Sequence, residues 1–172
     1  LYVQYIEYLG GLVQGDMGYS YISNTEASTR IFAKLPATLE LAFAGTIVAI
    51  VISIPLGVIS ATRRNTPADY GATLFSLLGI STPNFWLGIM LVLLFAVQLD
   101  LFPTSGRPVG FDVAMASLLF KMEIGPLITW LSHITLPAVA LGTYFTALIT
   151  RLTRSEMLDE MGKMYINAVR AK

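Results

Sequence analysis

The chain has 172 residues, of which 55% are hydrophobic and 13% are charged, and its formal net charge is zero. Soluble domains carry about 25% charged residues, so this composition indicates a membrane protein. A balanced charge gives no reason to expect a nucleic-acid partner. The absence of cysteine excludes disulfides, thiolate metal sites and cysteine nucleophiles.

The first segment, residues 1–34, lacks a long apolar core and is predicted to lie outside the bilayer. Aromatic residues and glycines alternate irregularly between Leu1 and Gly18, which is typical of a short interfacial helix followed by turns. No signal-peptide pattern is present in these residues. The chain begins with Leu1 and ends inside a helical pattern, so we interpret it as an internal fragment of a longer protein.

Three uncharged segments follow, at 41–62, 70–99 and about 131–150, and from them we predict membrane helices at about 36–62, 69–99 and 131–155. Pro36 suits the first position of the first span, and Glu40 suits a helix N-terminus better than an ion-binding role. The second segment is longer than a bilayer of about 30 Å requires. It should therefore tilt, kink near Pro83 or extend beyond the bilayer.

The loop between the second and third spans, from about residue 100 to 132, is rich in turn residues. Residues 111–122 within it are predicted to form a short surface helix. Basic residues flank the spans unequally, and the richer side should be cytoplasmic. That side carries Arg63, Arg64, Arg151, Arg154, Lys163, Arg170 and Lys172, against Arg30, Lys34, Arg107 and Lys121 on the other. Most charges after the third span, Arg154 included, are expected on the exposed helix surface.

Small residues recur every four positions in the first and third spans, which indicates close helix–helix packing rather than lipid anchors alone. The predicted packing residues are Gly45, Ala49, Ser53, Gly57 and Gly142. A packing seam is favoured over a pore lining. Helix bends are expected at Pro55, Pro83 and Pro137.

The last residues of the chain, about 156–172, form an amphipathic helical pattern directly after the third span. Its apolar positions are spaced by three and four: Met157, Met161, Met164, Tyr165, Ala168 and Val169. Such a helix could grip a cytoplasmic partner. The pattern alone favours a solvated helix at the bilayer edge.

Several short sequence motifs are more specific than these patterns. The chain resembles inner-membrane permeases of ABC importers, specifically the dipeptide, oligopeptide and nickel permease group. The resemblance is carried in order by Leu35-Pro36-Ala37-Thr38-Leu39-Glu40-Leu41-Ala42, Ser81-Thr82-Pro83-Asn84-Phe85-Trp86-Leu87-Gly88, Phe102-Pro103-Thr104-Ser105-Gly106, Arg151-Leu152-Thr153-Arg154-Ser155 and Tyr165-Ile166-Asn167-Ala168-Val169-Arg170-Ala171-Lys172. It covers nearly the whole chain.

The resemblance implies an all-α, polytopic helix bundle, with three transmembrane helices in this fragment of a larger transmembrane domain at 35–172. At least one helix would precede Leu1 and two or more would follow Lys172. It places a coupling helix for an ATPase subunit at Met164, Tyr165, Asn167, Ala168, Val169, Arg170, Ala171 and Lys172. Asn167 and Val169 depart from the Glu-Ala-Ala pattern of that region.

The implied partners are ABC ATPase subunits, a second permease subunit forming a heterodimer, an extracytoplasmic substrate-binding protein and the lipid bilayer of the inner membrane. No cofactor is expected. No G-x-S-x-G, H-E-x-x-H or P-loop motif is present, so we expect a permease subunit without its own ATPase site. The substrate cannot be read from the residues. Two other classes stay open: an ion-coupled secondary transporter, which would need intramembrane acids, and a membrane scaffold subunit.

Overall fold

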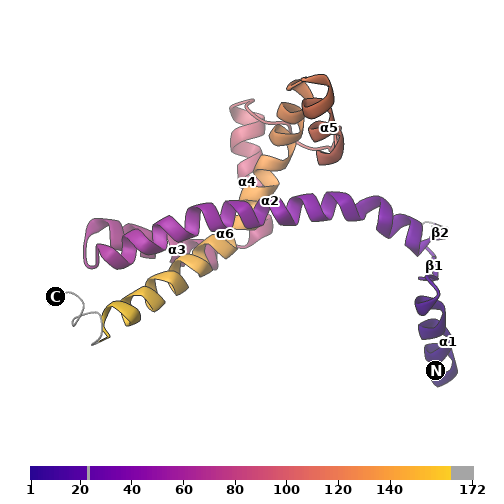
Figure 1. The fold of residues 1–172 in the computed structure, drawn as a ribbon, viewed down its shortest axis with the longest axis horizontal. Helices are drawn as coiled ribbons and strands as arrows, with labels where there is room; N and C mark the ends of the chain where they lie inside the picture. The colour runs from indigo at the N-terminus through magenta and orange to yellow at the C-terminus, as the bar shows by residue number, and fades with distance from the viewer. Residues whose placement is uncertain (23, 164–172) are drawn as a thin grey trace. The chain divides into compact units, whose positions relative to one another are not determined.

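A computed structural model describes residues 1–22 and 24–163 of the chain, and these residues form helices with one minimal hairpin (Figure 1). The chain divides into two compact units, one covering Leu1–Glu40 and the other beginning at Leu41. The division falls within a continuous helix, α2 (Ala27–Thr62). The all-α fold expected from the sequence is confirmed.

The first unit contains α1 (Tyr2–Val13), a two-stranded hairpin and the first turns of α2. The strands β1 (Tyr19–Ser20) and β2 (Thr25–Glu26) are antiparallel, with Tyr19 opposite Glu26. Gly18 has φ +78° and its amide donates a hydrogen bond of 2.8 Å to the Asp16 carboxylate. A side chain is strained at that φ, so glycine suits the turn that leads into the hairpin.

The helix α2 begins at Ala27, earlier than the start near residue 36 that Pro36 suggested. Pro36 therefore lies inside the helix and not at its first position. A proline there removes only one backbone donor, and the residues before it include several good helix formers. Pro55 also lies within α2, which is continuous through both prolines.

The second unit is arranged around α6 (Gly125–Met161), the longest helix (Figure 1). The helix α3 (Pro67–Ser81) packs against α6, as do α4 (Asn84–Leu91) and α5 (Phe111–Lys121). The contact of α3 lies toward the C-terminal half of α6. The contact of α4 lies toward its N-terminal half. In the α5 contact, the rings of Phe111 and Trp130 lie 5.0 Å apart between centroids.

The second predicted span is broken rather than straight. The helix α3 ends at Ser81, and α4 begins after Pro83 at an angle of 105° to it. Residues Val92–Gln98 continue α4 as a π-helix, η1. The predicted kink near Pro83 therefore exists as a sharp break, because the residue before a proline is pushed out of the helical region.

Within the described residues, α2 and α6 are each long and apolar enough to cross a membrane, and the pair α3 and α4–η1 makes a third span if it is counted as one. Large apolar side chains such as Phe43, Val51 and Phe85 are exposed in this chain. Exposed apolar surface of this kind suits contact with lipid or with further helices.

Candidate functional site

A buried ion pair joins α3 to α6 near the end of the bundle that holds the α2–α3 turn. The carboxylate of Asp69 accepts a hydrogen bond of 2.7 Å from Nε of Arg154 and one of 2.9 Å from its terminal guanidinium nitrogen. Asp69 is 3% exposed, and the Arg154 side chain is 30% exposed. The two-point geometry fixes the guanidinium plane against the carboxylate, as is usual for arginine–carboxylate pairs.

Two further groups donate hydrogen bonds to the Asp69 carboxylate. The hydroxyl of Ser60, on the last turn of α2, donates at 2.5 Å to the same oxygen that Nε contacts. The backbone amide of Asn65, in the α2–α3 turn, donates at 3.0 Å to the other oxygen. A buried charge is tolerated when it is paired and its oxygens are hydrogen-bonded, and both conditions hold here.

The sequence of the α2–α3 turn determines the position of the Asp69 carboxylate. Asn65 adopts φ +60°, a left-handed conformation that asparagine tolerates well, and so closes the turn after α2. Pro67 then opens α3, where its missing amide costs no helical hydrogen bond. Asp69 follows in the first turn, where the helix dipole favours a negative charge. The network therefore ties together the end of α2, the turn, the start of α3 and α6.

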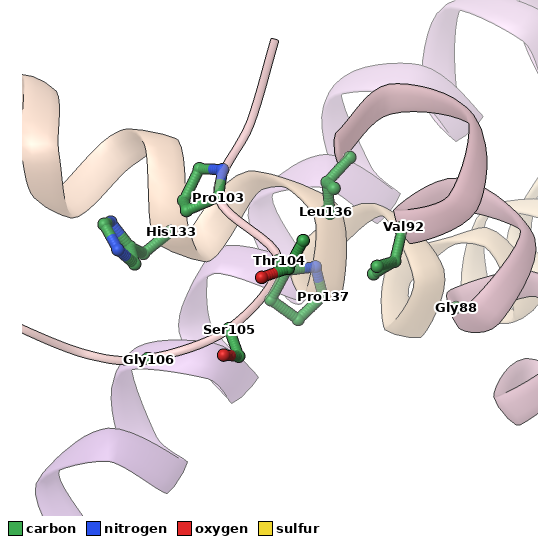
Figure 2. A pocket seen from close by; sticks show the side chains of 9 residues that line it. All are labelled: Gly88, Val92, Pro103, Thr104, Ser105, Gly106, His133, Leu136 and Pro137. Atoms are coloured by element: carbon green, nitrogen blue, oxygen red, sulfur yellow. The ribbon is translucent and has the colours of Figure 1, made fainter. Parts of the chain in front are cut away.

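A second feature lies toward the other end of α6. A cavity of about 280 Å³ is bounded by α4–η1, the loop after η1 and α6 (Figure 2). Its lining consists of Gly88, Val92, Pro103, Thr104, Ser105, Gly106, His133, Leu136 and Pro137. The helical side contributes mainly apolar groups, and the loop contributes two hydroxyls. Val92 opens the π-helix, and such segments occur often at functional sites.

His133 in this cavity has a defined hydrogen-bond arrangement. Its Nδ1 lies 2.7 Å from the Thr129 carbonyl oxygen, which can only accept. Nδ1 therefore carries a proton and donates to that oxygen. The described residues contain no group of three or more potential metal-binding side chains, His133 included.

The two features lie near opposite ends of α6. An α-helix rises about 1.5 Å per residue, so His133 and Arg154 lie about 30 Å apart along α6, close to the thickness of a hydrocarbon core. The ion pair belongs to the end that bears the α2–α3 turn. The cavity belongs to the end that bears the loop after η1.

The predicted packing residues lie where α2 approaches α6. Gly45, Ala49, Ser53 and Gly57 are buried on α2, and Gly142 is buried on α6. A Cβ at Gly142 would lie 2.8 Å from the Gly45 carbonyl oxygen. At the other end of the contact, a Cβ at Gly57 would lie 2.6 Å from Cβ of Thr153. The prolines expected at bends lie within helices at 55 and 137, and at the helix break at 83.

The predicted coupling residues, Met164, Tyr165, Asn167, Ala168, Val169, Arg170, Ala171 and Lys172, lie outside the described residues. The helix leading toward them is described. It continues from the third span to Met161 without interruption, and Met157 and Met161 are half-buried on one face.

The expectation that Arg154 lies on the exposed helix surface is wrong, since Arg154 pairs with buried Asp69. The sequence contains one signal that could have indicated this. With three crossings, the start of the second span and the end of the third lie at the same membrane surface, so an acid at one and a base at the other can meet. Nothing in the pattern distinguishes Arg154 from Arg151 one turn earlier.

The helical composition, the two long apolar helices α2 and α6, and the broken helix pair between them define a polytopic α-helical membrane protein. A sequence model of the family described as "Binding-protein-dependent transport system inner membrane component" matches residues 53–172. The chain belongs to this family, which places it in the inner membrane. This match confirms the resemblance to ABC importer permeases that the short sequence motifs indicated.

Curated relatives share the sequence along the entire described fold. The chain is 43% identical over 172 residues to the oligopeptide transport system permease protein AppB of Bacillus subtilis, covering 99% of the chain and 51% of the relative. It is 37% identical over 182 residues to the dipeptide transport system permease protein DppB of Escherichia coli K12, covering 100% and 54%. The di/tripeptide permease protein DppB of Pseudomonas aeruginosa is 37% identical over 179 residues, covering 100% and 53%. The chain thus spans about half the length of these relatives.

Proposed function

We propose that this chain is part of the permease subunit of an ATP-driven ABC importer that moves peptides across the inner membrane. The family match over residues 53–172 carries this proposal, and the three relatives described above, each named as a peptide permease, support the substrate class. The permease has no ATPase site of its own. Separate ATPase subunits supply the energy, and a second permease subunit completes the membrane pathway.

The orientation of the chain follows from its basic residues. The α2–α3 turn, with Arg63 and Arg64, lies on the cytoplasmic side together with the end of α6. The loop after η1 and the cavity of Figure 2 then face outward, where an extracytoplasmic binding protein delivers the peptide. Residues 1–34 are proposed to lie outside the bilayer on the extracytoplasmic side, so that the first turns of α2 would extend beyond the bilayer.

The segment after α6 is proposed as the coupling helix that docks on an ATPase subunit. Its apolar positions, Tyr165, Ala168 and Val169, form the docking face, and Arg170 and Lys172 offer charge to the partner. Ala168→Glu would place an unpaired charge in a desolvated contact, which is costly. The full-length variant should insert in the membrane but lose ATPase association or coupled transport. Unchanged substrate-stimulated ATP hydrolysis in the assembled complex would contradict this assignment.

The experiment that tests the function uses the full-length protein produced with the products of its neighbouring genes. An importer predicts copurification with an ATPase subunit. It also predicts peptide uptake into proteoliposomes that requires both ATP and a binding protein. Uptake driven by an ion gradient without ATP would identify a secondary transporter instead. A complex with neither uptake nor an ATPase partner would identify a scaffold. Dipeptides and longer peptides tested in parallel would define the substrate range.

A further inference from the structure

The contacts between α3 and α6 are concentrated on one half of α6. Near the far end of α3, a Cβ at Gly79 would lie 2.7 Å from Cβ of Ala147, so the two helices approach closely there. Near the start of α3, Asp69 forms its two-point ion pair with Arg154. Ser76 of α3 and Thr150 of α6 are both buried between these points. Two separated attachments make α3 and this half of α6 one mechanical unit.

Beyond Gly79 this unit ends abruptly. The helix is interrupted between Ser81 and Asn84, and α4 runs at 105° to α3. The helix α4 packs on the other half of α6, where a Cβ at Gly88 would lie 3.8 Å from Cβ of Ala140. A break of two residues between helices is a place where backbone rotation is least costly. Movement of α3 relative to α4 would therefore be absorbed at Thr82 and Pro83.

The ion pair stands at the junction between this unit and the segment that follows α6. Arg154 lies on the last turns of the helix, which ends at Met161, shortly before residue 164. The Asp69 carboxylate also accepts hydrogen bonds from the Ser60 hydroxyl of α2 and from the Asn65 backbone amide in the turn. A displacement beyond Met161 therefore reaches the α2–α3 turn and the start of α3 through this carboxylate, whereas α2 also contacts α6 directly where Gly57 packs against Thr153.

We propose that Asp69 and Arg154 are positioning residues that couple movement of the segment after α6 to α3, so that the displacement reaches the break at Thr82–Pro83. Without the pair, the attachment near Gly79 would remain, but the start of α3 would lose its tie to the end of α6 and less of the displacement would reach the break. This inference rests on the proposed function, since it assigns the pair to the coupling of ATP hydrolysis to transport. It gives Arg154 a role distinct from docking, because its guanidinium is directed to Asp69.

The test uses the full-length permease, assembled with its ATPase subunits and partner permease in proteoliposomes. Peptide uptake and ATP hydrolysis are measured on the same preparation. Arg154→Gln and Asp69→Asn should each lower the number of peptides moved per ATP hydrolysed at least tenfold, with hydrolysis itself retained. Arg151→Gln is the matched control, because Arg151 is exposed and lies one turn earlier on α6. It should leave the ratio unchanged.

Single variants leave one buried charge without its partner and could prevent folding. The double variant Asp69→Asn with Arg154→Gln removes both charges and avoids that penalty. It should assemble and be equally uncoupled. Arg154→Lys, which retains the charge but not the two-point contact, should give an intermediate ratio.

The proposal is wrong if the double variant transports with the wild-type ratio, or if it fails to assemble, since the pair would then serve stability alone. A wild-type complex that does not import peptide with ATP would overturn the proposed function instead. The two failures are therefore distinguishable.

Discussion

Gly142 of α6 lies directly against the backbone of Gly45 on α2, so that a Cβ at residue 142 would come within 2.8 Å of the Gly45 carbonyl oxygen. The neighbouring group is backbone and cannot rotate away. The side chain of Val48 closes the same site, with Cβ at 3.2 Å. Close backbone approach of this kind is the main source of helix association in lipid, where apolar burial supplies little.

Gly142→Ala should therefore destabilise the protein by about 1–3 kcal/mol, the usual cost of overpacking a close contact. Gly71→Ala is the matched control, because Gly71 is also within a helix but has open space where its Cβ would lie. Thermal denaturation of the full-length protein in detergent would measure both. An equal effect of the two substitutions would show that helix propensity, and not the contact with Gly45, sets the result.

The four-residue spacing of small residues on α2 and α6 was readable in the sequence, because contact faces of helices follow the helical period. The break at Pro83 was also readable, since a proline restricts the residue before it. The start of α2 could not be predicted from the sequence, because Pro36 is compatible both with the first position of a helix and with a position inside it. Which basic residue pairs with Asp69 depends on the rotation of α6 about its axis, and no sequence period determines that to within one turn.

Ala49→Leu should impair assembly of the helix bundle. Ala49 is 2% exposed on the α2 face that carries Gly45 and Ser53, so a larger side chain there must push neighbouring helices apart. Ala42→Leu provides the control, because Ala42 is exposed on the same helix. Yield of the assembled complex, measured by size-exclusion chromatography, should fall for the first variant only. Normal assembly of Ala49→Leu would indicate that this face can separate without loss.

Gly79→Ala should be rescued by a second substitution on α6. Its Cβ would meet Cβ of Ala147 at 2.7 Å, whereas the next nearest atom, the Thr143 carbonyl oxygen, lies at 3.5 Å. Removing the Ala147 methyl group therefore relieves the clash. In a double-mutant cycle, Gly79→Ala with Ala147→Gly should be more stable than the sum of the two single effects by at least about 0.5 kcal/mol. Additive effects would mean that α3 and α6 separate at this point in solution.

Cysteine labelling should place the two ends of the bundle on opposite sides of the membrane. Arg64→Cys in the α2–α3 turn and Ser105→Cys in the loop after η1 are both at exposed positions, and the chain contains no cysteine of its own. In intact cells, an impermeant maleimide should label residue 105 and not residue 64. Any native cysteine in the remainder of the full-length protein would first be replaced. Labelling of residue 64 from outside would reverse the proposed orientation.

Ser53 and Ser60 provide an internal comparison of buried hydroxyls on one helix. Both are 0% exposed on α2, but only Ser60 has a hydrogen-bond partner, the Asp69 carboxylate at 2.5 Å. The Ser53 hydroxyl is the one buried side-chain polar atom without a partner among the described residues. A buried hydroxyl without a partner loses its hydrogen bonds to water and so destabilises the fold, whereas a hydrogen bond to a charged group contributes about 1.5–3 kcal/mol.

Ser60→Ala should therefore lower the free energy of unfolding by about 1.5–3 kcal/mol, because Asp69 loses a donor in a buried site. Ser53→Ala removes the same oxygen and should be neutral or slightly stabilising, because no partner is lost. The two variants change volume equally, so the difference between them isolates the hydrogen bond. Equilibrium unfolding of the full-length protein in mixed detergent micelles would measure it. A larger loss for Ser53→Ala than for Ser60→Ala would mean that the Ser53 hydroxyl has a partner, such as an ordered water or a neighbouring subunit, in the assembled membrane protein.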